Sequence, residues 1–153
     1  IHLVPQVYIH ELEALEQVSP QADDQLRLIG RRHVRSNNSW MHNSQRLVKG
    51  KTRCTVMLHP QDAERLGITD NGEVEVSTEA GSICLPAEIT DSIMPGVVSI
   101  PHGFGHAREG VRLGVASRHA GVSINDVIRN DRTDALTGTA ILNGQTVQVR
   151  AAG

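Results

Sequence analysis

The sequence predicts a mainly β protein: a small barrel, closed or nearly closed, with one or two short helices. Three observations support this fold class. Only 2% of the 153 residues are aromatic, so Val, Ile, Leu and Ala must form the core, and the β-branched members of that set favour strands. Six or seven short apolar or alternating runs follow residue 25, and turn glycines separate them. The length and the 39% hydrophobic content fit one compact domain.

Residues 1–25 are interpreted as a linker from a preceding domain. Apolar residues between Val7 and Val18 are spaced among glutamates as in a short amphipathic helix, which Ser19-Pro20 would end. The same segment lacks the basic and then apolar pattern of a signal peptide. Because the chain opens with Ile1 in a run that resembles the middle of a protein, we expect a fragment of a longer polypeptide or a processed product.

The barrel domain is expected over residues 26–153. Strand-like runs occupy residues 26–30, 54–58, 73–78, 83–89 and 97–100. Pro86 predicts that the fourth of these strands is an edge strand or contains a bulge, because proline has no backbone N–H to donate to a neighbouring strand. After the second strand, Pro60 suits the first position of a helix and Gly67 suits the residue that follows its end, which predicts one short helix.

A closing hairpin is predicted at the C-terminal end, where the turn Asn143-Gly144 would join strands at residues 139–142 and 146–149. Two polar loops, residues 31–50 and 101–121, interrupt the strand pattern. Loops longer than about 15 residues in a compact domain are usually functional or disordered. We therefore look for the functional residues in these two loops.

Charge is distributed unevenly along the chain, although the formal net charge is only −2. Residues 25–61 hold eight of the 15 basic residues and none of the 17 acidic ones, which gives this segment a charge of +8. A positive segment within a negative chain indicates a local site for an anion.

The sequence gives little support for a membrane span or for a disulfide bond. No stretch approaches the roughly 20 apolar residues that a membrane span requires, so we expect a cytoplasmic protein without a membrane span. Cys54 and Cys84 form no CxxC motif and each lies in an apolar, strand-like run. Both are predicted to be buried thiols, because free cysteine packs as a small hydrophobic residue.

The most informative stretch is residues 31–43, which follows a predicted strand and is rich in Arg, Asn and Ser. Arginine presents a planar fork of donors that suits phosphate, and Asn and Ser supply the mixed donors and acceptors that a heterocycle edge requires. This chemistry is typical of a nucleotide site. The alternative is a solvated surface loop that happens to be basic.

Several ordered blocks together closely resemble the C-terminal molybdopterin dinucleotide-binding domain of the dimethyl sulfoxide reductase family, which includes formate dehydrogenases and nitrate reductases. The resemblance covers about residues 26–150. Its blocks are Gly30-Arg31-Arg32, residues 38–43, His59-Pro60-Gln61-Asp62-Ala63-Glu64-Arg65-Leu66-Gly67-Ile68, Gly72, the strand pair around Gly81, Pro95-Gly96-Val97-Val98, Pro101-His102-Gly103-Phe104-Gly105-His106 and Asn125.

The resemblance implies a six-stranded double-psi β-barrel that helps to hold a bis(molybdopterin guanine dinucleotide) cofactor, with molybdenum or tungsten, through its pterin and pyrophosphate. It implies a larger oxidoreductase whose other domains are the partners of this one, and an isolated domain that is not catalytic and holds no metal ligand. The implied cofactor contacts are Arg31, Arg32, Arg35, Asn38, Ser39, Trp40, His42, Asn43, His102, Gly103 and Asn125.

Individual residues have competing interpretations. His102 and His106 could bind zinc in a helix, but the glycines between them disfavour one and no third ligand is evident. Trp40 could stack on a pterin or guanine ring, or could anchor its loop by packing on the barrel. Asn125 could contact the pterin, or could cap the turn that begins near Ser123.

Two other functions stay open at this point. A barrel module could bind nucleic acid through the basic segment, or could bind a protein; one aromatic residue in that segment is few for nucleic acid, so no nucleic-acid partner is expected. Gly81-Ser82 is the kind of pair at which a pyruvoyl-dependent decarboxylase of similar fold cuts itself. Its position suggests an ordinary turn into a strand instead.

Overall fold

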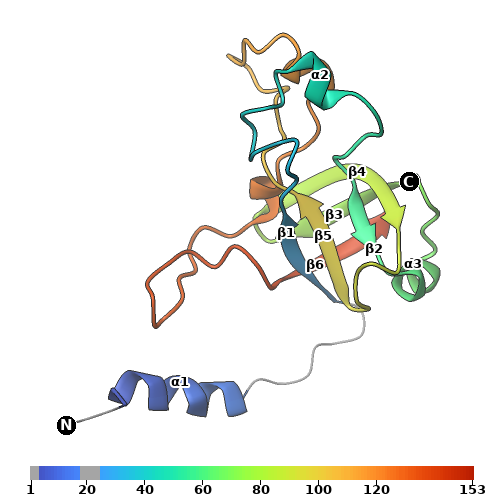
Figure 1. Cartoon of the computed structure of the whole chain (residues 1–153). Coiled ribbons are helices and arrows are strands. Elements are labelled where there is room, and N and C mark those ends of the chain that lie inside the picture. The colour runs from blue at the N-terminus through green and yellow to red at the C-terminus, as the bar shows by residue number, and fades with distance from the viewer. Residues whose placement is uncertain (1–3, 18–24) are drawn as a thin grey trace.

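The computed structural model describes residues 4–17 and 25–153. Six strands close into a barrel in the order β1-β5-β2-β4-β3-β6, which confirms the predicted mainly β fold (Figure 1). The strands are β1 Leu26–Arg31, β2 Val56–Leu58, β3 Glu73–Thr78, β4 Gly81–Ile89, β5 Val97–Pro101 and β6 Gln145–Ala151. The helices are α1 Gln6–Glu16, α2 Gln45–Val48 and α3 Pro60–Leu66, with 3-10 helices η1 Ala116–His119 and η2 Ile124–Val127.

The strand pairing is unchanged when the first three strands are exchanged for the last three. β1 is parallel to β5 as β4 is to β2, and β1–β6 is antiparallel as β4–β3 is. The antiparallel pairs β2–β5 and β3–β6 map onto themselves. Two interlocked copies of one pattern, each with a parallel pair in an otherwise antiparallel barrel, form the double-psi arrangement.

Alternating side chains of the strands fill the barrel. Val74 and Val76 of β3 are fully buried between more exposed neighbours, as the alternating sequence predicts. Val147 and Val149 of β6 follow the same rule. The predicted helix is confirmed as α3, which ends at Gly67 with a φ of 65°.

The predicted closing hairpin is wrong. β6 pairs with β1 on one side and with β3 on the other, so the closed barrel leaves it no free edge for a strand at residues 139–142. That segment instead forms an irregular arm whose single bridge joins Thr133 to Ala140. Leu142 on this arm is exposed.

Two predictions for β4 also need correction. The strand is not an edge, because β2 and β3 flank it; Pro86 is tolerated because it pairs with Glu73 at the end of one ladder, one residue before pairing with β2 begins at Ala87. Cys84 is exposed, since it alternates with the inward-facing Ile83 and Leu85. Gly81 begins this strand, as an ordinary turn into a strand would.

The N-terminal helix is confirmed as α1, and none of its residues is buried. The predicted stop at Ser19-Pro20 lies outside the described residues. None of the helices within residues 4–17 and 25–153 combines the length and the hydrophobicity that a membrane span requires.

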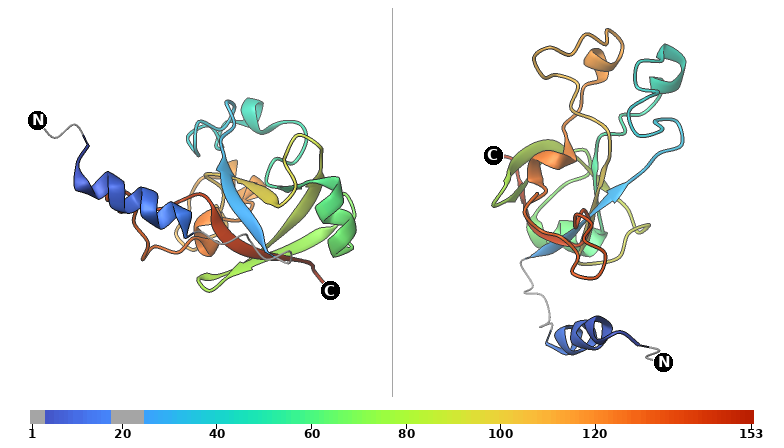
Figure 2. Two further views of the ribbon diagram at one scale, coloured as in Figure 1. Left: turned by 90° about the horizontal axis from the view of Figure 1, so that it is seen from below. Right: turned by 90° about the vertical axis from the view of Figure 1, so that its left-hand side faces the viewer.

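The parallel pairing of β1 and β5 determines where the long loops lie. Arg31 at the end of β1 is in register with Pro101 at the end of β5, so the chain leaves both strands at one end of the barrel. We call residues 32–55 the basic loop and residues 102–123 the second loop. Figure 2 shows both loops rising side by side from that end.

Candidate functional site

Arg31 fastens both ends of the basic loop to the barrel. Its guanidinium donates to the carbonyl of Ser99 on β5, and to the carbonyl and hydroxyl oxygens of Thr55 at 2.9 and 2.7 Å. Glu88 lies 3.8 Å away. Burial lowers the pKa of Arg31, and the charge of Glu88 partly offsets this effect. Most of the donors of Arg31 are therefore occupied by protein oxygens.

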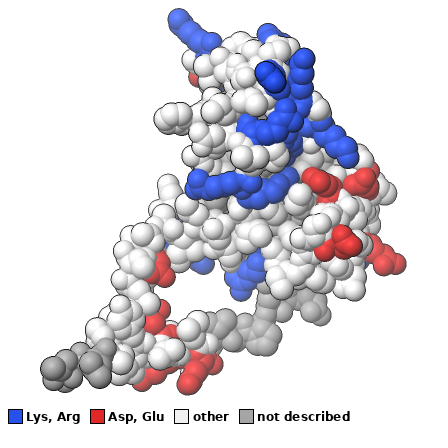
Figure 3. Space-filling model, in the orientation of Figure 1, with Lys and Arg blue, Asp and Glu red and all other residues white. Residues whose placement is uncertain are grey.

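A cleft of about 860 Å³ lies between the basic loop and the barrel, and we call it the basic cleft. Its wall holds five basic residues and only two acidic ones, which are Arg31, Arg35, Lys49, Lys51 and Arg53 with Asp70 and Glu88. Figure 3 shows that Lys and Arg gather over the loop end, whereas Asp and Glu gather lower on this face. The positive segment of the sequence is thus concentrated around one cavity.

One polar group in the wall of the basic cleft has no protein partner. The hydroxyl of Ser36 is buried, with 2% of the residue exposed, and it forms no hydrogen bond within the described part of the chain. A buried polar group without a partner costs about 1–3 kcal/mol. An anion in the cleft would supply the missing acceptor once a small shift of the loop exposed this hydroxyl.

The arginines of this wall also crowd one another. Arg53 donates to the carbonyls of Leu47 and Lys49, both at 2.9 Å, and so holds the turn that contains α2. Burial lowers the pKa of Arg53, and the charge of Arg35 lowers it further. Arg35 itself donates to the carbonyl of Arg46 at 3.1 Å. A bound anion would relieve this repulsion.

The outer part of the basic loop carries four more of the predicted contacts. Arg32 donates to the side-chain oxygen of Asn38 at 2.7 Å, and Asn38 has a left-handed φ of 61°. Ser39 is half-buried, and Trp40 is 82% exposed. The interpretation of Trp40 as an anchor packed on the barrel is therefore wrong, because its ring has almost no protein surface around it.

Three predicted residues instead join the basic loop to the second loop. His42 is buried, and its Nδ1 lies 2.8 Å from Nε2 of His106. The side-chain oxygen of Asn43 accepts the backbone N–H groups of Val115 and Ala116, at 3.0 and 3.2 Å. Gly103, with a φ of 91°, lies so close to the basic loop that a Cβ there would clash with the carbonyl group of Asn38, 2.6 Å from its carbon.

The remaining two predicted residues are separated from each other. His102 lines the basic cleft, and its backbone N–H donates to the carbonyl of Arg31 at 2.9 Å. Asn125 lies exposed inside η2 and does not line the cleft. It does not cap a turn from Ser123 either, since Ser123 itself occupies the cap position of η2. Across residues 4–17 and 25–153, no group of three or more His, Cys, Asp or Glu could hold a metal ion.

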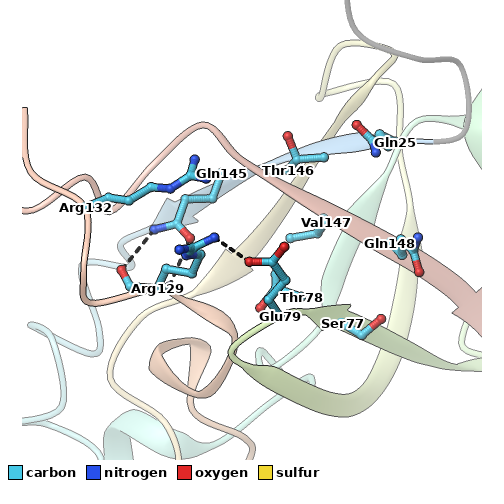
Figure 4. Close-up of a pocket in the computed structure, with 10 residues that line it drawn as sticks. All are labelled: Gln25, Ser77, Thr78, Glu79, Arg129, Arg132, Gln145, Thr146, Val147 and Gln148. Carbon is cyan, nitrogen blue, oxygen red and sulfur yellow. Dashed lines mark hydrogen bonds and ion pairs between the residues drawn. The ribbon is translucent and has the colours of Figure 1, made fainter.

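A second cavity, of about 500 Å³, lies beside β6 and is less suited to an anion (Figure 4). Its Arg129 is already paired with Glu79 and with Asp131. The side chain of Gln145 accepts the backbone N–H of Arg129 at 3.0 Å, which holds that arginine in place. The basic cleft is therefore the better candidate.

The predicted contacts omit several residues that the structure places in the site or its supports. Lys49, Lys51 and Arg53 line the cleft, and the absence of acidic residues from 25 to 61 was the signal for them. No signal in the sequence identifies Ser36, because its burial depends on the folded loop. His106 becomes important only through its contact with His42.

Comparisons with known proteins identify the family of the chain. Residues 26–146 match the family described as "Molydopterin dinucleotide binding domain". A tetrathionate reductase subunit from Salmonella typhimurium (strain LT2) is 33% identical over 93 residues, which are 55% of this chain and 9% of that protein. The molybdopterin-containing subunit of the arsenate respiratory reductase of Chrysiogenes arsenatis is 29% identical over 115 residues, which are 71% of this chain and 13% of that protein.

A solved structure supports the fold. Acetylene hydratase from Pelobacter acetylenicus superposes with a TM-score of 0.71 at 21% identity, over 98% of this chain and 20% of that chain. The chain thus spans only a small part of the length of each of these proteins. Because the family match covers most of the residues from the first strand of the barrel to the last, the chain belongs to the family of molybdopterin dinucleotide-binding domains.

Proposed function

We propose that this domain forms the C-terminal part of a larger molybdopterin oxidoreductase and holds the diphosphate of a bis(molybdopterin guanine dinucleotide) cofactor in the basic cleft. The observation that carries the proposal is a cavity with five basic residues and a buried, unpartnered hydroxyl at Ser36. Cations together with a missing acceptor fit a phosphate group better than a neutral ligand.

The basic residues of the cleft would have two different roles, shaping the cleft and contacting the phosphates directly. Arg31 has most of its donors on protein oxygens, so it would shape the cleft and add its charge rather than grip a phosphate. Arg35, Lys49 and Lys51 are exposed along the cleft wall and would make the direct contacts. Charge-assisted hydrogen bonds of this type contribute about 1.5–3 kcal/mol each when water is excluded.

The other predicted contacts would lie along the rest of the cofactor. Trp40, held out from the barrel, would stack on a ring, and Arg32, Asn38 and Ser39 beside it would contact ring edges or phosphate. His102 would reach the cleft from the second loop. We retain His42, Asn43 and Gly103 as residues that position these contacts, and Asn125 as a contact outside the cleft.

The cofactor supplies the redox chemistry of such an enzyme through molybdenum or tungsten, and the protein supplies binding, orientation and electrostatics. The domain contributes binding, so we expect no catalysis from it alone. Its partners would be the remaining domains of the parent enzyme, and the expected cytoplasmic location stays a prediction.

A titration of the 153-residue chain with guanosine diphosphate tests the proposal. We expect measurable but weak binding, because the open cleft leaves water around the phosphates. Lys51→Gln should weaken it roughly three- to tenfold, the equivalent of about one partly screened charge-assisted contact. The control Arg132→Gln removes the same charge from the second cavity and should leave the affinity unchanged.

Equal losses in the two variants would show that only net charge matters and would contradict a specific site. A parallel titration with a duplex oligonucleotide at two salt concentrations distinguishes the nucleic-acid alternative. The proposal fails if the oligonucleotide binds more tightly than guanosine diphosphate at both salt concentrations.

A further inference from the structure

The basic loop and the second loop touch through a pair of histidines. His42 belongs to the basic loop, His106 belongs to the second loop, and their facing ring nitrogens are 2.8 Å apart. The rings meet edge-on at 89°, and the ring of Phe104 lies against His42 with a centroid separation of 4.3 Å. Only 3% of His42 is exposed, whereas His106 is half-buried, so the His42 side of this contact is shielded from water.

The histidine pair is the centre of a wider junction. Asn43, the next residue after His42, accepts the N–H groups of Val115 and Ala116 on the second loop. Gly103 packs on the backbone of Asn38. The junction therefore fixes the part of the basic loop that follows Ser36, a residue of the cleft wall whose buried hydroxyl has no hydrogen-bond partner among the described residues.

We propose that His106 is a positioning residue for the basic cleft: through His42 it ties the basic loop to the second loop while at least one ring is neutral, and it releases the loop when both rings are protonated. The effect of this release on cofactor binding rests on the function proposed above. The pH-dependent contact between the two loops does not depend on that function.

The hydrogen-bond chemistry of the pair gives the sign of this effect. A nitrogen–nitrogen hydrogen bond needs one donor and one acceptor, so it forms when one or both rings are neutral. Two imidazolium rings would present N–H groups to each other and repel. Acid therefore opens the junction, and neutral pH closes it.

The surroundings of the pair also oppose protonation. Burial lowers the pKa of His42, and the charges of His106 and Arg53 lower it further; burial lowers the pKa of His106 as well. A backbone hydrogen bond at Gly103 only partly offsets these effects on the two pKa values. Cys54 stays a neutral thiol, because burial raises its pKa. The charged residues that line the cavity beside His42 are mostly cationic, Lys51, Arg53 and Arg118 against Glu73, and the exposed His119 also lines it.

The directions of these pKa shifts determine how the stability of the closed junction depends on pH. A histidine whose pKa is lowered in the closed state stabilises that state fully above its ordinary value of about 6.5. This stabilisation is lost as the pH falls below that value. The opening of the junction is thus expected in the weakly acidic range.

Amide hydrogen exchange of the 153-residue chain tests the proposal, with the N–H groups of Val115 and Ala116 as reporters. After correction for intrinsic exchange, we expect their protection to fall about tenfold or more between pH 7.5 and pH 5. Protection at Val76 and Val149 in the barrel should not change over this range. His106→Gln, which keeps a hydrogen-bonding side chain but cannot be protonated, should hold the reporters' protection roughly constant.

The matched control is His119→Gln, an exposed histidine of the same loop, which should keep the fall seen in the natural sequence. A titration of the ring signals of His42 and His106 in the unaltered chain is independent of any variant, and both should titrate below about 6.5. Reporter protection that does not change with pH would overturn the proposal, as would an unaltered fall in His106→Gln. No ligand is present in this experiment, so its failure would leave the binding test above unaffected.

Discussion

Two equivalent connections of the barrel differ greatly in length. The pairing symmetry relates the β1–β2 connection, residues 32–55, to the β4–β5 connection, residues 90–96. The short connection is held at Gly96, whose backbone N–H donates to the buried carboxylate of Asp62 at 2.7 Å. The long connection holds the cations of the basic cleft. A few residues therefore suffice to close this barrel, and the additional length serves the site.

The same comparison holds for the other pair of connections. The β2–β3 connection contains α3 and little else, whereas the β5–β6 connection contains the second loop, η2 and the irregular arm. Both long connections begin at the paired ends of β1 and β5. The extra chain is thus added at one end of a symmetric scaffold, where the two loops can support each other.

The largest expected effect comes from forcing the long loops apart. Gly103→Ala would drive a Cβ into the carbonyl group of Asn38 at a φ of 91°, so we expect the free energy of unfolding to fall by about 3 kcal/mol. Gly110→Ala is the matched control, because its φ of 86° carries similar strain but no atom lies within 4 Å. It should cost about 1 kcal/mol in urea denaturation. Equal costs would mean that the two loops do not depend on their close contact.

A smaller effect is expected where the long connection is fastened to the barrel. Arg31→Gln would leave the carbonyls of Ser99 and Thr55 without their donor, and the expected loss is about 2–3 kcal/mol in the free energy of unfolding. Arg32→Gln on the exposed loop should change stability by less than about 0.5 kcal/mol. If Arg31→Gln abolished guanosine diphosphate binding without loss of stability, Arg31 would be a direct ligand instead of a support.

The predictable parts of the fold are those with a local signal. β3 alternates over Glu73–Thr78, and α3 carries its own start and stop at Pro60 and Gly67. The hairpin at residues 139–149 also had a local signal, yet β6 pairs with strands far away in the sequence. Asn143 lies in a bend, and its side chain accepts the N–H of Gly30 on β1 at 2.7 Å.

The site was predictable as a charge pattern but not as a set of contacts. The run without acidic residues indicated an anion site, and the structure gathers that run around one cleft. Which arginines have free donors depends on carbonyl groups from other strands, as Arg31 and Ser99 show. Cys84 is different: the strand alternation that buries Ile83 and Leu85 contained the information that it is exposed.

A further, smaller loss of stability than that of Arg31→Gln is expected where the side chain of Asn43 caps the second loop. Asn43→Ala removes the acceptor for the N–H groups of Val115 and Ala116 at the start of η1, and losses of this kind cost about 1 kcal/mol. Asn43→Asp keeps an acceptor oxygen and should retain most of that stability in urea denaturation. Since both changes lie outside the wall of the basic cleft, a loss of guanosine diphosphate affinity in Asn43→Ala that Asn43→Asp restores would show that the second loop holds the first in its binding position. Unchanged affinity in both variants would restrict the role of Asn43 to stability.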